Sequence, residues 1–415
     1  MNARDLALME LDGRELPRWD KHVVRDAVGP SQIDERDRAL GEKIYAVVVK
    51  NLLALQFLTE HYSKRQLDQI DPVAQKILAI GLAQLRFLSR IPASAAVDEA
   101  VKQTRRFGRK SAAGFVNAVL RNATREPGVA LPQRVGLSHP GEMIDRLTEL
   151  FGEDQAVAIC EHDNAEPPTL VRLCRGMEAA ALQADGVSVR PHQDRGIFVV
   201  EGARRATLGE WSSRGIAQVQ DATAAGVVPR LDLRAGQRVL DRCCGLGTKT
   251  RQIRELVGET GRIVAVDPSG QRCAVLRELL RQQKIENVDV VQAEMISPME
   301  PAAFDCALVD VPCSNSGVMA RRVEARYMQT RERLESLVKL QKAILADTAA
   351  WVKVGGLLMY STCSLWPEEN QERAAAFLRG RDDYELVEEK LTLPAGKDEA
   401  TAYRDGGYWA LLRRR

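Results

Sequence analysis

The chain has no long uncharged hydrophobic run. Its most apolar stretch, residues 44–58, contains Lys50 and is shorter than the ~18 apolar residues that a membrane-spanning helix needs. The first 20 residues are charged from the fourth position onward and lack the apolar core of a secretory signal. We therefore expect a cytoplasmic protein without a membrane partner.

Metal-binding and hydrolase motifs are also missing. The eight cysteines lie without the paired spacing of metal ligands, so we expect reduced thiols and no metal. The five histidines end at His192. They all precede the C-terminal region that holds the most informative motifs, which disfavours a cysteine–histidine hydrolase built within that region.

Composition and length predict a multidomain globular protein. Hydrophobic residues make up 45% and charged residues 28% of 415 positions, which argues against a disordered or collagenous chain. At about 150 residues per domain, two or three domains are expected. The patterns described below divide the chain into a helical domain 1–135, a linking α+β subdomain 136–220 and an α/β domain 221–415.

The N-terminal segment predicts a helical bundle. Apolar side chains recur at three- and four-residue spacing over 38–64 and 71–90, and further helices are expected from about 94 to 107 and over 111–124. Asp71 precedes Pro72, the order expected for an N-cap residue and the first helical position.

The same segment is basic. Residues 1–135 hold 22 lysines and arginines against 16 acidic residues. On helices such a cluster forms either a phosphate-binding face or a solvated surface, and charge alone does not separate the two. The candidate RNA contacts here are Arg105, Arg106, Arg109, Lys110 and Arg121.

The rest of the chain predicts two kinds of sheet. A helix over 141–161 and strands over 169–173 and 197–200 suggest a small α+β insert. Beyond it, strand-like runs alternate with amphipathic helices, the pattern of an open, doubly wound parallel sheet. The expected strands are 238–243, 262–267, 288–292, 304–309 and 356–361, and the helices are 249–257, 270–284, 335–353 and 368–379.

A glycine-containing turn follows the first of these strands, which includes Asp241. The turn reads Cys243, Cys244, Gly245, Leu246, Gly247, Thr248, Lys249. Glycines between a strand and a helix let a ligand approach backbone amides, and Asp267 ends the next strand where an acid binds ribose hydroxyls. Either a nucleotide-type cofactor or a purely structural turn fits. The missing third glycine favours S-adenosylmethionine over NAD.

Two cysteines follow two other strands. One segment reads Asp310-Val311-Pro312-Cys313, the other Ser361-Thr362-Cys363-Ser364. The carboxyl ends of the strands form the ligand crevice of such sheets. A single cysteine is usually a small hydrophobe, but two at one crevice favour nucleophilic catalysis. Thiolate addition to carbon 6 of cytosine, with N3 hydrogen-bonded, would let carbon 5 accept a methyl group.

These motifs resemble the RNA 5-methylcytosine methyltransferase family, the NOP2/NSUN-like superfamily, and nearly the whole chain is similar to its RsmB/Sun branch of 16S rRNA (cytosine-967) methyltransferases. Pro312-Cys313, Thr362-Cys363-Ser364 and the Pro367–Asn370 helix start carry the resemblance. Ile91-Pro92-Ala93 and residues 115–122 match its helical domain, which is like the antitermination factor NusB.

The resemblance implies a class I S-adenosylmethionine methyltransferase fold, Rossmann-like with a seven-stranded doubly wound sheet, after an all-α NusB-like bundle. It implies methyl transfer to carbon 5 of a cytosine in small-subunit rRNA. Cys363 would attack carbon 6, Cys313 would assist release, and Asp310 would contact the cytosine and border the cofactor. We expect a monomer.

The resemblance also assigns the cofactor contacts. Asp267 would hold the ribose, Glu294 would lie by the adenine, and Cys243 to Lys249 would surround the methionine end. The family's motif usually runs Ala-Pro-Gly-Gly-Lys, whereas this chain has Cys244-Gly245-Leu246-Gly247-Thr248-Lys249, which loses the proline and moves a glycine. Glu294 stands where Asp is usual. A non-catalytic RNA-binding or ribosome-assembly factor that keeps the fold is the alternative function.

Residues after the Cys313 loop supply further RNA candidates. Arg322 is one of five arginines between residues 321 and 333. This cluster fits contacts with RNA phosphates and a solvated charged helix equally well. Trp366 fits stacking on an extruded base or packing in a core.

Overall fold

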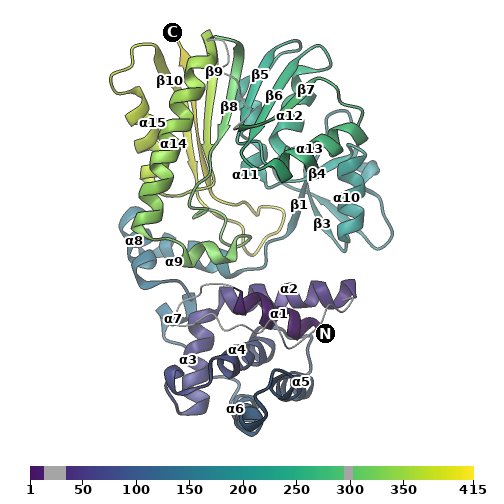
Figure 1. Ribbon diagram of the computed structural model, residues 1–415, viewed down its shortest axis with the longest axis vertical. Coiled ribbons are helices and arrows are strands. Elements are labelled where there is room, and N and C mark those ends of the chain that lie inside the picture. Colours follow the sequence, from purple (N-terminus) through teal and green to yellow (C-terminus); the bar gives the residue numbers. More distant parts are fainter. Residues whose placement is uncertain (14–33, 294–301) are drawn as a thin grey trace. The chain divides into compact units, whose positions relative to one another are not determined.

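The computed structural model describes residues 1–13, 34–293 and 302–415. The chain divides into two compact units, Met1–Asn164 and Ala165–Arg415 (Figure 1). In its described residues the first unit is helical throughout. Its helices are α1 (Ala3–Asp12), α2 (Glu35–Lys50), α3 (Leu52–Ser63), α4 (Pro72–Phe87), α5 (Ala93–Arg106), α6 (Ala113–Arg125), α7 (Gln133–Leu137), α8 (Gly141–Phe151) and α9 (Glu153–Asn164).

Capping interactions set the helix boundaries of this unit. The Asp71 carboxylate accepts hydrogen bonds from the amides of Val73 and Ala74, which confirms the predicted N-cap of α4. The helical pattern predicted over 38–64 corresponds to two helices, because α2 ends at Lys50 and its C-cap residue Asn51 donates its side-chain amide to the carbonyl of Val47. The predicted helix 141–161 is likewise two helices, since Gly152 has a φ of 82° between α8 and α9.

The second unit begins with a four-stranded antiparallel sheet in the order β2-β3-β1-β4. Its elements are β1 (Thr169–Leu173), β2 (Ser188–Pro191), β3 (Ile197–Glu201), α10 (Arg205–Ser213) and β4 (Ala217–Val219). Leu170, Ile197 and Val199 pack on Ala222 and Ala225 of the following helix α11 (Ala222–Ala225). This packing attaches the small sheet to α11, which precedes the first strand of the larger sheet.

A seven-stranded sheet in the order β10-β11-β9-β8-β5-β6-β7 forms the body of this unit. Strands β5 to β9 pair in parallel, and β11 pairs antiparallel with β9 and β10. The strands are β5 (Arg238–Arg242), β6 (Arg262–Asp267), β7 (Val288–Gln292), β8 (Phe304–Asp310), β9 (Val352–Thr362), β10 (Tyr384–Thr392) and β11 (Gly407–Arg414).

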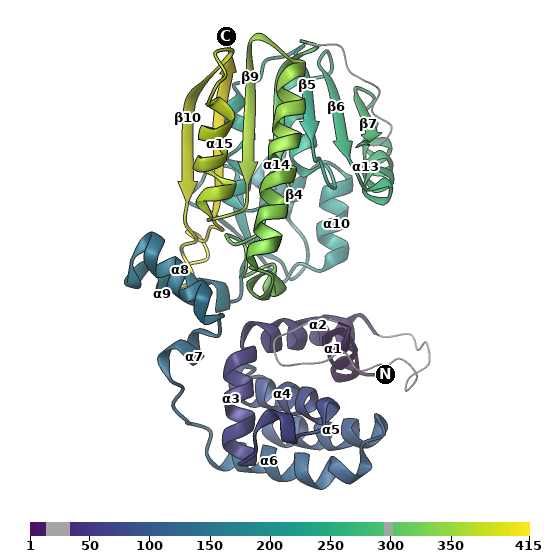
Figure 2. The ribbon, with the colours of Figure 1, turned by 60° about the vertical axis from the view of Figure 1, so that its left-hand side comes forward.

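Helices cover both faces of this sheet. Helices α14 (Arg331–Trp351) and α15 (Gln371–Leu378) lie on one face (Figure 2), where Leu345 and Phe377 join the strand core. Helices α12 (Thr248–Val257) and α13 (Gly270–Gln282) contribute Ile253 and Leu276 to the core on the other face. The predicted doubly wound, Rossmann-like sheet is confirmed.

The chain order places a crevice at the carboxyl ends of β5 and β8. These neighbouring strands lead to α12 and α14, which lie on opposite faces of the sheet. Their connections therefore diverge, and the space between them is where ligands bind in open α/β sheets. None of the helices among the described residues has both the length and the apolar character needed to span a bilayer.

Candidate active site

The two cysteines predicted to meet are in contact. The sulfur atoms of Cys313 and Cys363 lie 3.1 Å apart. Strands β8 and β9 pair in parallel with Asp310 opposite Ser361, so the chain enters both cysteine loops from adjacent positions at the same edge. Both cysteines are free thiols.

Asn315 links the two loops. It adopts a left-handed conformation with a φ of 61°, which asparagine tolerates better than most residues. Its side-chain amide donates to the carbonyl of Cys313, and its side-chain oxygen accepts from the Cys363 thiol at 3.2 Å. Asn315 is not among the predicted site residues, although it lies only two residues after Cys313.

The two thiols have different surroundings. Cys313 is 6% exposed, whereas Cys363 is partly exposed. The hydrogen bond with Cys363, then burial, then the negative charges of Cys363 and Glu369 raise the pKa of Cys313 well above the ordinary value. Cys363 is therefore the more accessible sulfur, and Cys313 is the one that retains its proton.

A lysine and an acid lie beside the cysteine pair. Nζ of Lys249 is 2.6 Å from Oδ2 of Asp310, and the Ser361 hydroxyl donates to Oδ1 at 2.7 Å. Burial lowers the pKa of Lys249, but the charge of Asp310, the hydrogen bond to it and a smaller effect of Cys363 together raise that pKa. Lys249 therefore brings a fixed positive charge to the crevice.

A buried polar network supports both cysteine loops. The Ser364 hydroxyl is 3.1 Å from that of Ser314 and 3.0 Å from that of Ser316. The Glu369 carboxylate accepts from the backbone amide and the hydroxyl of Ser314 and from the side-chain amide of Gln341. In the sequence Glu369 is recognisable only as part of a helix start, because its partners lie in distant segments.

The glycine turn presents backbone groups to the crevice. Cys243, Gly245 and Gly247 have φ values of 65°, 59° and 79°. The amide of Gly245 donates to Oδ2 of Asp267 at 3.0 Å, and the amide of Ser269 donates to Oδ1 at 2.9 Å. The turn between β5 and α12 is thus tied to the end of β6.

This turn fits the methionine end of S-adenosylmethionine. Gly247 is the N-cap of α12 and offers no side-chain cap, so the first amides of the helix are available to an anionic carboxylate. A Cβ at Gly245 would meet no atom within 4 Å, which leaves open space over the turn. Leu246 is 54% exposed and could cover a ligand there.

The other residues predicted to bind the cofactor are Asp241, Cys243, Cys244 and Glu294. Asp241 is fully buried and accepts from the Thr250 hydroxyl at 2.5 Å, while its Oδ1 has no hydrogen-bond partner in the described parts of the chain. Burial raises the pKa of Asp241 to about 7 and that of Cys243 to about 12, and it also raises the pKa of Cys244. These thiols are therefore protonated. Glu294 lies outside the described residues.

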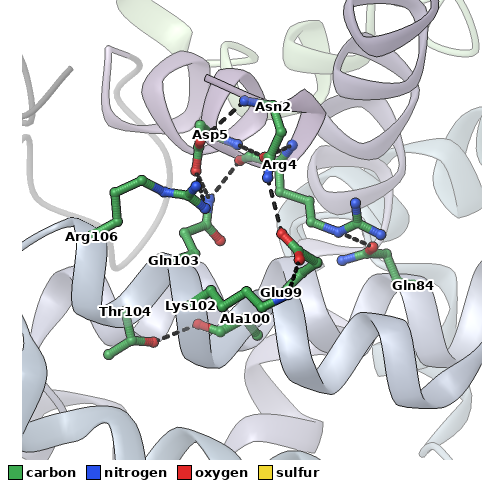
Figure 3. A network of polar contacts seen from close by, with 10 residues as sticks. All are labelled: Asn2, Arg4, Asp5, Gln84, Glu99, Ala100, Lys102, Gln103, Thr104 and Arg106. Atoms are coloured by element: carbon green, nitrogen blue, oxygen red, sulfur yellow. Dashed lines mark hydrogen bonds and ion pairs between the residues drawn. The ribbon is translucent and has the colours of Figure 1, made fainter.

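Two of the predicted RNA contacts are ion-paired within the helical unit. Arg106 of α5 lies 3.2 Å from the fully buried Asp5 of α1 (Figure 3), and Arg109 lies 2.9 Å from the N-cap residue Asp71. Both arginines hold helices together. The other candidates in this unit, Arg105, Lys110 and Arg121, are exposed.

The predicted RNA contacts after the Cys313 loop also include both exposed side chains and side chains with partners inside the protein. Arg322 is exposed, but Arg326 is fully buried, and Arg321 pairs with Asp405 at 2.7 Å. Trp366 is 2% exposed and donates its indole N–H to Gln329. The stacking role for Trp366 is therefore wrong, because its ring is packed inside the protein. Among the described residues no group of three or more potential ligands could hold a metal ion.

Comparison with known proteins identifies the family. The 16S rRNA methyltransferase RsmB/F model matches residues 228–405, and the NusB family model matches residues 1–125. The chain is 31% identical to ribosomal RNA small subunit methyltransferase B of Pseudomonas putida over 92% of this chain and 91% of that protein. The chain belongs to the RsmB family. The probable RsmB of Synechocystis is 30% identical over 96% of this chain and 93% of its own.

Solved structures support the fold of an RsmB-type chain. A methyltransferase homologue from Pyrococcus horikoshii has a TM-score of 0.55 at 24% identity and covers 68% of this chain and 98% of its own. The structure of NSun6 from P. horikoshii with SFG has a TM-score of 0.54 at 18% identity, over 66% and 98% of the two chains. At these identities the likeness concerns the fold alone.

Proposed function

We propose that this protein transfers the methyl group of S-adenosylmethionine to carbon 5 of a cytosine in small-subunit rRNA, through a covalent adduct between Cys363 and the cytosine. The observation that carries the proposal is the contact of the two thiols at 3.1 Å beside the Lys249–Asp310 pair. Two cysteines, a lysine and an acid at one edge of a methyltransferase sheet suit a nucleophilic addition followed by an elimination.

The cofactor would lie against the glycine turn. The free amides at the start of α12 suit its carboxylate. Asp267, which accepts from the Gly245 amide, would accept from the ribose hydroxyls. When bound, S-adenosylmethionine supplies an electrophilic methyl group. Asp241 would act through Thr250 by holding the start of α12.

Each side chain of the site has its own role in the reaction of the cytosine. The Cys363 thiolate adds to carbon 6, and Lys249 stabilises negative charge beside it. Asp310, fixed by Lys249 and Ser361, contacts N3 and the exocyclic amine. Carbon 5 would then form the bond to the methyl group as the sulfonium–methyl bond breaks, with S-adenosylhomocysteine as the leaving group. A water molecule would next take the proton from carbon 5, the electron pair of that carbon–hydrogen bond would form the 5,6 double bond, and the carbon–sulfur bond would break and return the Cys363 thiolate. Cys313 assists by hydrogen-bonding to the departing sulfur.

Family membership and exposed positive charge support the proposed RNA target. Relatives named ribosomal RNA small subunit methyltransferase B suggest 16S rRNA, and the family's cytosine 967 is the first nucleotide to test. Arg105, Lys110, Arg121 and Arg322 are exposed and suit contacts with phosphates. Arg106 and Arg109 are left out of this set because of their ion pairs.

Transfer of labelled methyl groups to unmodified small-subunit rRNA tests the proposal. We expect label in 5-methylcytosine, no transfer by Cys363→Ala, and a trapped protein–RNA adduct with Cys313→Ala. Cys174→Ala, which alters a buried cysteine near the small sheet, serves as the matched control and should remain active. Tight RNA binding with no transfer to any rRNA would support the assembly-factor alternative.

A further inference from the structure

Glu369 is a buried carboxylate in an unusual environment. It is fully buried at the end of the short 3-10 helix Pro367–Glu369. Its oxygens accept three hydrogen bonds, from the Ser314 amide at 2.9 Å, the Ser314 hydroxyl at 2.5 Å and the Gln341 side chain at 2.9 Å. All three donors are neutral, and within the described parts of the chain Glu369 forms no ion pair. A buried charge without a cation is costly and points to a role.

We propose that Glu369 is a positioning residue that holds the Cys313 thiol against Cys363. The inference rests on the proposed function. Ser314 directly follows Cys313, so both of its hydrogen bonds to Glu369 fix the peptide that carries the thiol. Gln341 on α14 extends the clamp, since its side-chain amide also donates to the carbonyl of Pro312 at 3.0 Å. Glu369 therefore holds Cys313 from both of its neighbours in the sequence.

The same network reaches the other cysteine loop. Ser314 is hydrogen-bonded to Ser364, which follows Cys363. The carbonyl of Glu369 accepts from the hydroxyl of Tyr360 on β9 at 2.6 Å, three residues before Cys363. Glu369 thus connects the segments that carry both sulfurs, through its carboxylate to Ser314 and through its backbone carbonyl to Tyr360. These contacts explain how two thiols on separate loops stay within 3.1 Å.

The charge of Glu369 acts on the protonation of the pair. Among the described residues, the titratable groups that act on Cys313 are Tyr360 from β9, Cys363 just after β9 and Glu369 from the 3-10 helix, and Arg373 of α15 faces Tyr360. Negative charge on Glu369 is one cause of the raised pKa of Cys313. When the two thiols share one proton, Glu369 therefore favours a Cys313 thiol that donates to a Cys363 thiolate.

Alkylation of Cys313 measures this effect without methyl transfer. The pH dependence of its reaction with iodoacetamide is followed by peptide mass spectrometry in a Cys363→Ala protein, which removes the hydrogen bond that is the largest cause of the raised pKa. Adding Glu369→Gln should move the midpoint to lower pH. Glu372→Gln removes an exposed carboxylate from the next helix and should leave the midpoint unchanged. An unmoved midpoint in a folded Glu369→Gln protein overturns the proposal.

A milder substitution covers the case in which Glu369→Gln does not fold. Ser314→Ala removes the hydroxyl donor and leaves the carboxylate and the backbone donor in place. In otherwise unaltered protein it should lower kcat about tenfold or more and leave the KM values for RNA and cofactor within about twofold. An unchanged kcat contradicts the positioning role. Absence of any transfer by the parent enzyme refutes the proposed function instead, and the alkylation experiment still reports on Glu369.

Discussion

Lys249 and Asp310 form an ion pair of 2.6 Å between the start of α12 and the end of β8. The pair joins the two loops that diverge at the crevice, one belonging to the proposed cofactor site and the other to the proposed cytosine site. A change in Lys249 should therefore affect both sites. Asp310 keeps a second partner, Ser361, so its position depends only in part on the lysine.

We expect Lys249→Met to lower kcat for methyl transfer about a hundredfold or more, because a preorganised charge beside the reacting atoms is lost. Lys353→Met is the matched control. Lys353 pairs with Asp305 at 2.5 Å at the opposite end of β8, so its loss should leave kcat within about twofold. Equal effects of the two substitutions in steady-state kinetics would show that Lys249 has no special role.

The glycine turn gives a prediction about stability. Gly247 has a φ of 79°, and a Cβ there would lie 2.2 Å from Cδ1 of Leu276. Gly247→Ala should therefore lower the free energy of unfolding by about 3 kcal/mol, the sum of left-handed strain and overpacking. Gly380→Ala has a similar φ of 74°, in the turn that follows α15, but its Cβ would meet no atom within 4 Å, and this substitution should cost about 1 kcal/mol. Urea unfolding of both variants measures the difference.

The sheet and the cysteine pair were predictable because they follow from local patterns and one topological rule. Strands that alternate with helices predict a parallel sheet, and parallel strands end at the same edge, so Cys313 and Cys363 had to converge. Strand β10 was missed because it is an edge strand with mostly exposed residues. Its acidic sequence therefore lacks the apolar alternation of a half-buried strand.

The role of Glu369 and the pairing of Arg106 could not be predicted in the same way. The partners of Glu369 lie 55 and 28 residues away in the chain, and Asp5 belongs to a different helix from Arg106. No periodicity connects such positions. A basic residue on an exposed helix face looks the same in sequence whether it meets RNA or a buried carboxylate, and only the packing of α1 on α5 separates the two.

Arg105 and Arg106 should therefore differ in their effects. Arg106→Glu places a second carboxylate beside the buried Asp5 (Figure 3) and should lower stability by about 3 kcal/mol. Arg105→Glu should leave stability within about 0.5 kcal/mol and weaken RNA binding with a shallower salt dependence. Thermal unfolding and RNA titrations at two salt concentrations check both. If neither variant binds RNA more weakly than the parent, the RNA-binding surface lies elsewhere.

Asp241 makes stability depend on pH. Burial raises its pKa in the folded protein to about 7, above the ordinary value of about 3.9 in the unfolded chain. Between these values the folded state holds a proton that the unfolded state has lost, so stability falls as pH rises through this window. We expect Asp241→Asn, which can still accept from Thr250, to gain on the order of 3 kcal/mol relative to the parent between pH 4 and pH 8. Asp232→Asn, at an 83% exposed side chain, is the control and should show no such gain. Urea unfolding at pH 4 and pH 8 measures the free energy of unfolding of each protein. If this free energy changes with pH to the same extent in Asp241→Asn and in the parent, Asp241 stays ionised inside the fold.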